Sequence, residues 1–323
     1  MKEEIAIIGT GFIGSELASY LSSKFFVKTF DIRDQPSFLK ELNIPHKRID
    51  VRDFEKLNKN IGNPNLLIHT AIIQLPLINE NPVLGLETNL LGTYNILKVI
   101  QKHRIEKMIL LSSLQVLGQK FKKKKIAEEE CYNLLNLEPR SKLYVYSKAL
   151  QEILTLFHKD FLKDKKFVIM RLGTVLGERM SKSSAINIFI ENALKGRPIT
   201  PFKHSLYRPM TYVDIRDVCN VCAKIINFLE THEGDIFNVC YPKSFTVLQT
   251  AKFIQRIIKN ETHGKIIPKI RIINKNLPSI FNKKSKIEVD VSKLKNKLHV
   301  KRLISPPQTL KRIIRHKLKQ INQ

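Results

Sequence analysis

Short apolar runs alternate with amphipathic stretches along the first half of the chain. Mostly apolar runs predict buried strands at residues 5–8, 27–31, 66–70, 107–113 and 167–172. Between them, apolar residues recur every three or four positions and predict helices at residues 14–23, 89–103 and 144–161. Strands that alternate with helices build a parallel sheet covered on both faces. We therefore expect an α/β fold with a doubly wound, Rossmann-type sheet.

The pattern becomes less regular after residue 170. It predicts helices at residues 185–195 and 215–229 and short strands at residues 210–213 and 236–239. A partly helical stretch follows, broken by Pro268, Pro278 and the Pro306-Pro307 pair. We therefore expect a Rossmann domain at residues 1–170 and a smaller, mixed α/β region at residues 171–323. Segments at about 208–240 are expected to return to the first sheet.

The chain is strongly basic, with a formal net charge of +27 over 323 residues. Clustered Lys and Arg side chains can bind nucleic-acid phosphates, but here the excess is only mildly concentrated, at residues 283–286 and 311–319. Charge runs are mostly solvated faces, so a nucleic-acid partner is not expected. In either case a positive field attracts an anionic substrate.

The four cysteines predict neither disulfides nor a metal site. Cys219 and Cys222 form a C-x-x-C, but they lie in an apolar helical segment without a second ligand pair, so we expect buried thiols. The N-terminus leads directly into a strand and does not resemble a signal peptide. The longest apolar stretch, residues 66–78, is too short to span a membrane. We expect a soluble, cytoplasmic protein.

A glycine-rich turn stands between the first predicted strand and helix. Residues 9–14 read G-x-G-x-x-G, a spacing that allows a tight turn, close approach to a pyrophosphate and close packing of helix on strand. The positive end of the helix dipole then faces the phosphates. The residues expected to contact a dinucleotide here are Gly9, Gly11, Phe12, Ile13 and Gly14.

The end of the second strand distinguishes between two dinucleotides. Asp31 follows the glycines at about the spacing at which a carboxylate accepts hydrogen bonds from the adenosine ribose hydroxyls. It would repel a 2′-phosphate, which favours NAD over NADP. Arg33 keeps NADP open, because a guanidinium two residues later could bind that phosphate.

Tyr144 and Lys148 form the candidate proton-transfer pair. Their spacing of four residues puts both side chains on one face of a helix. A phenol is a weak acid, with a reference pKa of about 10, and a nearby ammonium lowers it. Such a pair can move a proton to or from a sugar hydroxyl when a hydride acceptor lies beside it. Ser113 ends a predicted strand and is the third candidate catalytic residue.

With these residues in place, the chain resembles the extended short-chain dehydrogenase/reductase family, and within it the nucleotide-sugar epimerase/dehydratase branch. The resemblance runs nearly end to end, and the matching segments occur in the family's order. Besides the glycine turn, they are Asp50-Val51, His69-Thr70-Ala71, residues 89–97, 111–118, 144–148, 171–177, 208–214 and 290–293.

The resemblance implies roles for individual residues. Asp50 and Val51 would hold the adenine, while Thr70, Ala71 and Asn89 would line the cofactor, with His69 packed beneath it. Lys148 would bind the nicotinamide ribose, and Ser113 would hydrogen-bond the substrate oxygen. The candidate substrate-binding residues are Ser113, Gln115, Thr174 and, for the diphosphate, Arg208.

Some positions depart from the family pattern. Ile8 replaces the family's usual first glycine, Thr174 replaces an asparagine that contacts substrate phosphates, and Leu117 and Leu176 replace two tyrosines. Dehydratase relatives carry an Asp-Glu pair after the catalytic Ser or Thr. The corresponding Leu114 and Gln115 can act neither as acid nor as base, which argues against 4,6-dehydration.

Taken together, the sequence predicts NAD-dependent epimerisation of a nucleotide-activated sugar by transient oxidation, of the UDP-glucose 4-epimerase type. Two alternatives stay open: an NAD(P)-dependent reductase or dehydrogenase on a related sugar, and a non-catalytic regulatory or RNA-associated binding protein with a dinucleotide fold. The resemblance also implies a homodimer formed through helix 89–103 and the helix that carries Tyr144.

Overall fold

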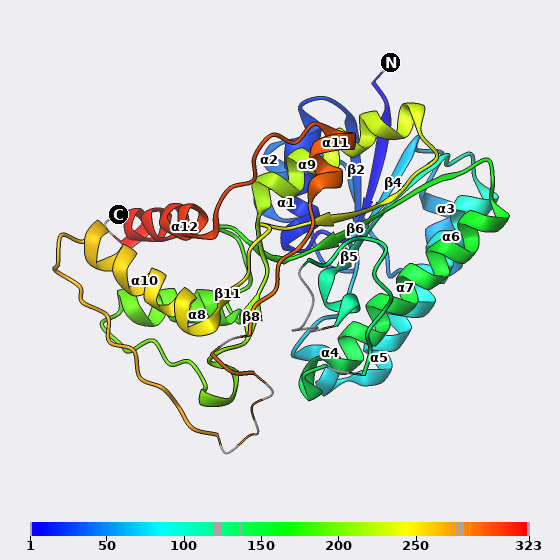
Figure 1. Cartoon of the computed structure of the whole chain (residues 1–323). Helices are drawn as coiled ribbons and strands as arrows, with labels where there is room; N and C mark the ends of the chain where they lie inside the picture. Colours follow the sequence, from blue (N-terminus) through cyan, green and yellow to red (C-terminus); the bar gives the residue numbers. More distant parts are fainter. Residues whose placement is uncertain are drawn as a thin grey trace.

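The computed structural model describes residues 2–118, 125–135, 137–275, 277, 279, 281–283 and 285–321. Pro278 and Lys284, which the sequence analysis names, lie outside these ranges. A seven-stranded sheet with helices on both sides forms the larger part of the molecule, and a smaller region lies to one side of it (Figure 1).

All neighbouring strands of the large sheet are parallel, in the order β10-β6-β5-β4-β1-β2-β3. This arrangement confirms the predicted doubly wound sheet. The third strand was not predicted, because it is only three polar residues long and pairs at an edge. The strands are β1 (Glu4–Ile8), β2 (Phe26–Asp31), β3 (His46–Arg48), β4 (Leu66–His69), β5 (Lys107–Ser113), β6 (Lys166–Leu172) and β10 (Ile236–Val239).

Helices cover the two faces of this sheet and enclose separate cores. One core joins the sheet to α1 (Phe12–Ser22), α9 (Ile215–Thr231) and α11 (Ser292–Leu298). The other joins it to α3 (Phe54–Asn60) and α6 (Gly92–Lys102). The shorter helices are α2 (Ser37–Glu41), α4 (Leu77–Glu80) and α5 (Pro82–Leu86), and a π-helical turn (Glu87–Leu91) leads into α6.

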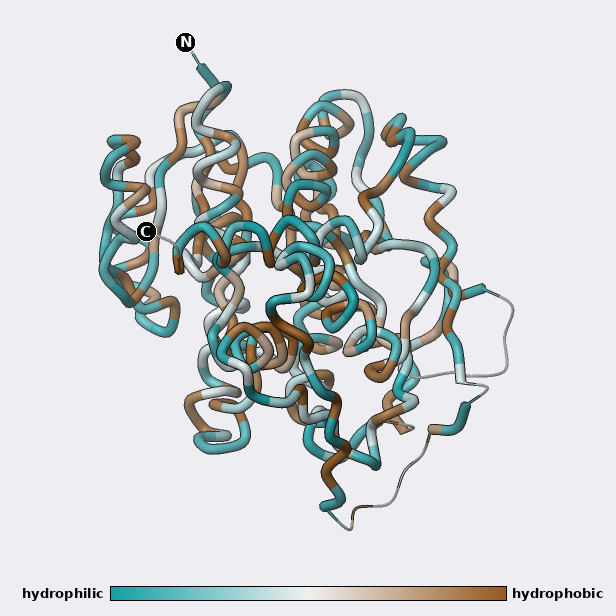
Figure 2. The backbone as a smooth tube through the Cα atoms, turned by 90° about the vertical axis from the view of Figure 1, so that its left-hand side faces the viewer, coloured by the Kyte–Doolittle hydropathy of each residue, from teal (hydrophilic) through white to brown (hydrophobic). Residues whose placement is uncertain are grey.

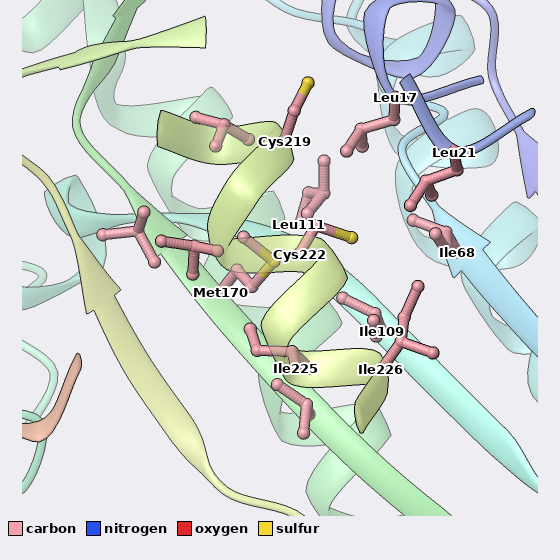
Figure 3. Close-up of a cluster of buried hydrophobic side chains, with 14 of the residues drawn as sticks. Leu17, Leu21, Ile68, Ile109, Leu111, Met170, Cys219, Cys222, Ile225 and Ile226 are labelled. Atoms are coloured by element: carbon pink, nitrogen blue, oxygen red, sulfur yellow. The ribbon is translucent and has the colours of Figure 1, made fainter. Parts of the chain in front are cut away.

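Figure 3 shows the first core, in which Cys219 and Cys222 of α9 lie among aliphatic side chains from α1 and the central strands. Both thiols are buried and unpaired, and burial raises their pKa values. They are therefore protonated at neutral pH and act as small apolar side chains.

The long helix α7 (Lys142–Phe161) lies along the same side of the sheet as α6 (Figure 1). A 3-10 turn, η3 (Pro139–Ser141), leads directly into it. Another 3-10 turn, η2 (Leu114–Leu117), follows β5. Because α7 contacts both β5 and η2, its first turns lie beside the carboxyl end of β5.

The smaller region packs three helices around its own core: α8 (Ala185–Leu194), α10 (Val247–Glu261) and α12 (Pro306–Ile321). Two strand pairs adjoin it: β7 (Thr174–Leu176) with β9 (Tyr212–Asp214), and β8 (Pro209–Met210) with β11 (Phe245–Thr246). A last 3-10 turn, η4, spans Lys203–Ser205. The single strand predicted at 210–213 is thus two strands that pair with different neighbours.

The chain passes between the two regions several times. After β7, α8 and β8 it returns to the large sheet as α9 and β10, and after α10 it returns as α11 before ending in α12 (Figure 1). Apolar and polar residues alternate along the helices, as expected for helices that bury one side (Figure 2). Within the described residues, no helix combines the length and hydropathy that crossing a membrane requires.

Candidate active site

The glycine turn after β1 leaves no room for side chains at two positions. Gly9 has a φ of +99°, and a Cβ there would lie 2.5 Å from the backbone nitrogen of Ala71. A Cβ on Gly14 would lie 1.9 Å from the carbonyl oxygen of Gly9. The Thr70 hydroxyl donates to that same carbonyl at 2.6 Å. The end of β4 therefore fixes the turn in a shape that only glycine permits.

The turn presents donors for which the described part of the chain offers no partner. Gly11 is the N-cap of α1, and no side chain caps the first turn, which also lacks an acidic residue. The buried hydroxyl of Thr10 has no hydrogen-bond partner among the described residues. Free backbone N–H groups at a helix N-terminus and a spare hydroxyl suit the oxygens of a pyrophosphate. This end of the site therefore fits a dinucleotide.

Asp31 and Arg33 form a compact pair at the end of β2. Arg33 donates from Nε to Oδ1 of Asp31 at 3.0 Å and from Nη2 to Oδ2 at 2.9 Å, and the Thr10 backbone donates to Oδ2 at 2.6 Å. Burial raises the pKa of Asp31, but these hydrogen bonds outweigh it and hold the pKa below its ordinary value. The carboxylate stays ionised, and a ribose diol would have to share it with Arg33 or displace that side chain.

An asparagine fixes the backbone of the segment that is expected to contact the adenine. The Asn95 side-chain amide donates to the carbonyl oxygens of Val51 at 2.9 Å and of Arg52 at 3.0 Å. Asp50 accepts hydrogen bonds from Nε and Nη2 of the Arg52 guanidinium, which lower its pKa although burial opposes this. Asn95 therefore supports the expected adenine site. It was not predicted as a site residue, although it lies in the 89–97 motif.

Asn89 connects three segments around the cofactor side of the site. Its amide accepts from the backbone nitrogen of Ile73 at 2.7 Å and donates to the carbonyl of Ile73 at 2.9 Å. It also donates to the Ser147 hydroxyl of α7 at 3.0 Å. The side chain is fully buried. It therefore fixes the backbone that follows Ala71 and the helix that carries the candidate catalytic residues.

His69 belongs to a buried network under this site. Its Nε2 lies 2.9 Å from the Thr93 hydroxyl, which also accepts from Gln151 of α7 at 2.7 Å. Burial, reinforced by the charge of Lys148, lowers the pKa of His69 to about 3. The imidazole is neutral at physiological pH, so it serves as a packing and hydrogen-bonding group.

Ser113, Tyr144 and Lys148 converge at the carboxyl end of β5. Ser113 is the last residue of that strand, and its hydroxyl accepts from the backbone nitrogen of Gln115 at 3.2 Å. Tyr144 is half-buried in the first turn of α7, and its phenol has Ser113 as a side-chain hydrogen-bond partner. One turn later, Lys148 is 4% exposed and donates to the carbonyl of Leu111 at 2.6 Å.

The ionisation of this triad differs from the simplest expectation. Burial raises the pKa of Tyr144 to about 12, and the hydrogen bond with Ser113 opposes the shift. Burial lowers the pKa of Lys148 to about 7, and the charge of Glu152 opposes that shift. Lys148 donates to a backbone carbonyl and is not among the groups that lower the pKa of the Tyr144 phenol in this form.

A buried ion pair lies next to Lys148 on the inner side of α7. Glu152 is 0% exposed and accepts from Arg171 of β6, with Nη2 to Oε2 at 2.8 Å. The Tyr132 hydroxyl donates to the same carboxylate at 3.0 Å, and Ser112 donates to its other oxygen at 2.5 Å. Glu152 was missed by sequence reasoning, although Lys148 and Glu152 have the spacing of helical neighbours.

Three of the predicted substrate residues line one pocket beyond β5. Gln115, Thr174 and Arg208 come from η2, β7 and the segment before β8, and apolar side chains such as Leu114 and Met210 complete the wall. Arg208 is buried and forms an ion pair with Glu138, a residue that the sequence analysis did not identify. The pocket therefore lies next to Ser113, and its wall contains residues from both regions of the fold.

Comparisons with known proteins agree with this arrangement. The family model described as "NAD dependent epimerase/dehydratase family" matches residues 5–240. A UDP-glucose 4-epimerase of Rickettsia rickettsii is 26% identical over 276 residues, which are 80% of this chain and 72% of that protein. An uncharacterised membrane protein of Methanocaldococcus jannaschii is 29% identical over 203 residues, 59% of this chain. The match spans only 54% of that relative's length.

Among solved structures, the fold is similar to that of UDP-glucose 4-epimerase from Thermotoga maritima with UDP-glucose. The TM-score is 0.82 at 21% identity, and the match covers 98% of this chain and 99% of the other. At this identity the similarity shows a shared fold over the whole length of both chains.

Proposed function

Because the chain belongs to the NAD-dependent epimerase/dehydratase family, we propose that it epimerises a nucleotide-activated sugar by transient oxidation with NAD. One observation carries this proposal: Ser113, Tyr144 and Lys148 meet at the carboxyl end of β5, between a dinucleotide-shaped turn and an arginine-lined pocket. The likeness to two UDP-glucose 4-epimerases supports the choice of reaction.

Gly9, Gly11, Phe12, Ile13 and Gly14 would hold the pyrophosphate of NAD, Asp31 and Arg33 the adenosine ribose, and Asp50 and Val51 the adenine. Thr70, Ala71 and Asn89 would shape the path towards the reacting end, where Lys148 binds the second ribose. Bound NAD supplies a hydride acceptor, which no side chain can provide. The paired carboxylate of Asp31 favours NAD, and NADP requires that Arg33 leave it for a phosphate.

Tyr144 takes the proton from the sugar hydroxyl and later returns it, while Ser113 hydrogen-bonds the same oxygen. For this the phenol has to ionise more readily than it does in this form, in which burial holds its pKa near 12. The ammonium of Lys148 could lower the pKa of Tyr144, because a positive charge beside a phenolate stabilises the phenolate. If Lys148 released the carbonyl of Leu111, its ammonium could move towards the phenol of Tyr144 and lower its pKa.

Residues 114 and 115 oppose a dehydratase function. Leu114 and Gln115 line the pocket where the Asp-Glu pair of dehydratase relatives would supply an acid and a base. Neither side chain titrates, so water elimination has no assigned proton donor or acceptor here. Gln115 can instead donate hydrogen bonds to a sugar hydroxyl, and Thr174 can do so in place of the relatives' asparagine.

Exposed apolar side chains on α6 and α7 support assembly as a homodimer. Tyr94 of α6 is 44% exposed, and on α7 the exposed fractions are 43% for Ile153, 56% for Phe157 and 70% for Phe161. Large side chains that share one exposed side of neighbouring helices mark an interaction surface. The cytoplasmic location and the lack of a nucleic-acid partner stay predictions.

The experiment that tests the function is incubation of the protein with NAD and a panel of nucleotide sugars. Epimer formation should be followed by NMR and NADH by absorbance. An epimer without net NADH supports the proposal. Net cofactor turnover would favour the reductase alternative, a 4-keto-6-deoxy product would indicate dehydration, and salt-sensitive RNA retention without sugar turnover would favour a binding protein.

A further inference from the structure

Glu138 holds one side of the Arg208 guanidinium inside the protein. Nη1 of Arg208 donates to Oε2 of Glu138, and each side chain is 10% exposed. The two residues are 70 positions apart in the chain. The ion pair therefore connects the segment that leads into α7 to Arg208, which lines the pocket.

A second donor of the guanidinium, Nε, is available to a ligand in the part of the chain that the structure describes. Nε of Arg208 is buried and has no hydrogen-bond partner among the described residues. A buried donor without an acceptor costs free energy that a bound acceptor recovers. The guanidinium offers its donors in a rigid fork, so a carboxylate on Nη1 leaves the edge that contains Nε for two phosphate oxygens. Arg208 lines the pocket in which such a group would lie.

Glu138 is itself fixed on all sides. Its Oε1 lies 2.9 Å from Nε of Arg140, in a second ion pair. Its backbone carbonyl accepts from both the nitrogen and the hydroxyl of Ser141, each at 2.8 Å. The turn η3 then leads within six residues to Tyr144.

We propose that Glu138 is a positioning residue, which orients Arg208 so that its free edge binds the diphosphate of the substrate. The inference rests on the proposed function, because it takes Arg208 as the diphosphate ligand. Glu138 acts through Arg208 and does not contact the substrate. Because it directly precedes η3 and α7, it also couples the place of the diphosphate to the start of the helix that bears Tyr144.

The test is nucleotide binding by calorimetry in the presence of NAD. The wild-type protein is titrated with UDP, dTDP, GDP and CDP, and the best diphosphate is compared with its monophosphate. We expect the wild-type protein to prefer the diphosphate. Glu138→Gln should weaken diphosphate binding by about tenfold or more, because the buried guanidinium loses its fixed orientation. Monophosphate binding should change little, so the preference falls, and KM for the sugar substrate should rise more than kcat falls.

Matched variants separate positioning from folding. Glu138→Asp keeps the negative charge but places the carboxylate one methylene farther from Arg208. It should weaken diphosphate binding less than Glu138→Gln does, and it remains informative if the Gln variant is unstable. Arg140→Gln removes only the exposed partner of Glu138 and should keep the preference. In an Arg208→Gln background, Glu138→Gln should cause no further loss, with NAD affinity and melting temperature as folding controls.

Unchanged or tighter diphosphate binding in the folded Glu138→Gln variant overturns the proposal, and so does a wild-type protein without diphosphate preference. Tighter binding would mean that Glu138 competes with the phosphates. Diphosphate preference without any sugar turnover would instead contradict the proposed function and leave the role of Glu138 standing.

Discussion

Lys148 donates a hydrogen bond to the backbone carbonyl of Leu111 at 2.6 Å, across the contact between α7 and β5. Leu111 lies two residues before Ser113, so this bond holds the lysine against the strand that carries the serine. In this form Lys148 is not among the groups that lower the pKa of Tyr144, which stays near 12. Under the proposed mechanism, Lys148 would therefore have to exchange this partner when substrate and NAD bind.

Replacing the phenol should remove the chemistry and spare cofactor binding. We expect Tyr144→Phe to lower epimerisation by about 10²- to 10⁴-fold, because the general base is lost. The matched control is Tyr146→Phe on the same helix, whose hydroxyl donates to the carbonyl of Leu134 at 3.3 Å. Turnover is measured by NMR and NAD affinity by calorimetry. Equal turnover in the Tyr144 variant and the wild-type protein would refute the assigned role.

Burial of Lys148 should make stability depend on pH. Its pKa is lowered from 10.5 to about 7 in the folded chain, so between these values the unfolded chain holds the extra proton. Relative to Lys148→Met, the free energy of unfolding should rise with pH from about 7 to 10.5. Each pH unit adds at most about 1.4 kcal/mol.

Chemical denaturation of both proteins at several pH values measures this difference. Below pH 7 the difference should be constant, with the Met variant the more stable, because both states of the wild-type protein then carry the ammonium. A difference that is flat from pH 7 to 10, or that falls, would show that the ammonium is not buried in solution.

Glu152→Gln should destabilise the fold strongly. It leaves the Arg171 guanidinium, which is 3% exposed, beside a neutral amide. Breaking a buried ion pair typically costs about 3–5 kcal/mol. As a control, Glu129→Gln removes an exposed carboxylate that lies 3.7 Å from Lys293 and should change stability by less than about 0.5 kcal/mol. Urea denaturation gives both values, and similar small losses for the two variants would contradict the buried pair.

Gly11→Ala should separate cofactor binding from folding. A Cβ at Gly11 would lie 3.6 Å from Nη2 of Arg33, an ordinary contact, so the melting temperature should stay near the wild-type value. The same methyl would stand where a pyrophosphate approaches the backbone, and NAD affinity should fall by about tenfold or more. Gly9→Ala should instead destabilise the fold itself. Normal NAD affinity in Gly11→Ala would place the pyrophosphate elsewhere.

Phe157→Glu should disrupt the expected homodimer. A charge in the exposed apolar surface of α6 and α7 should raise the dimer dissociation constant by about a hundredfold, the effect of removing a strong interface residue. Phe26→Glu is the control, because Phe26 is 44% exposed but lies on β2. Analytical ultracentrifugation measures both. A wild-type protein that is monomeric at high concentration would exclude this assembly.

The sequence predicted the fold well because periodicity is a local property. The helices predicted at 185–195 and 215–229 are α8 and α9 within two residues. The predicted helix at 89–103 begins as the π-helical turn Glu87–Leu91, a change of hydrogen bonding that periodicity does not reveal. Pro306 starts α12, as proline at a first helical position allows.

The candidate site was only partly predictable, because several of its groups are defined by contacts across long stretches of sequence. Glu138 meets Arg208 over 70 positions, Asn95 meets Val51 over 44, and Glu152 meets Arg171 over 19. Nothing near a glutamate in the sequence distinguishes one that is buried against arginine from one that is solvated. The hydrogen-bond partner of Lys148 is the backbone carbonyl of Leu111, and a sequence motif, which consists of side chains, does not predict a backbone partner.

The passage of the chain back and forth between the two regions limits how such an enzyme can diversify. The seventh strand of the sheet comes from Ile236–Val239, after a first excursion, and α11 returns after a second. A chimera that took the smaller region from a relative would need three separate grafts, with junctions inside packed structure. If these pocket residues bind the substrate as proposed, we therefore expect point changes around Gln115, Thr174 and Arg208 to alter specificity more easily than exchange of the whole smaller region.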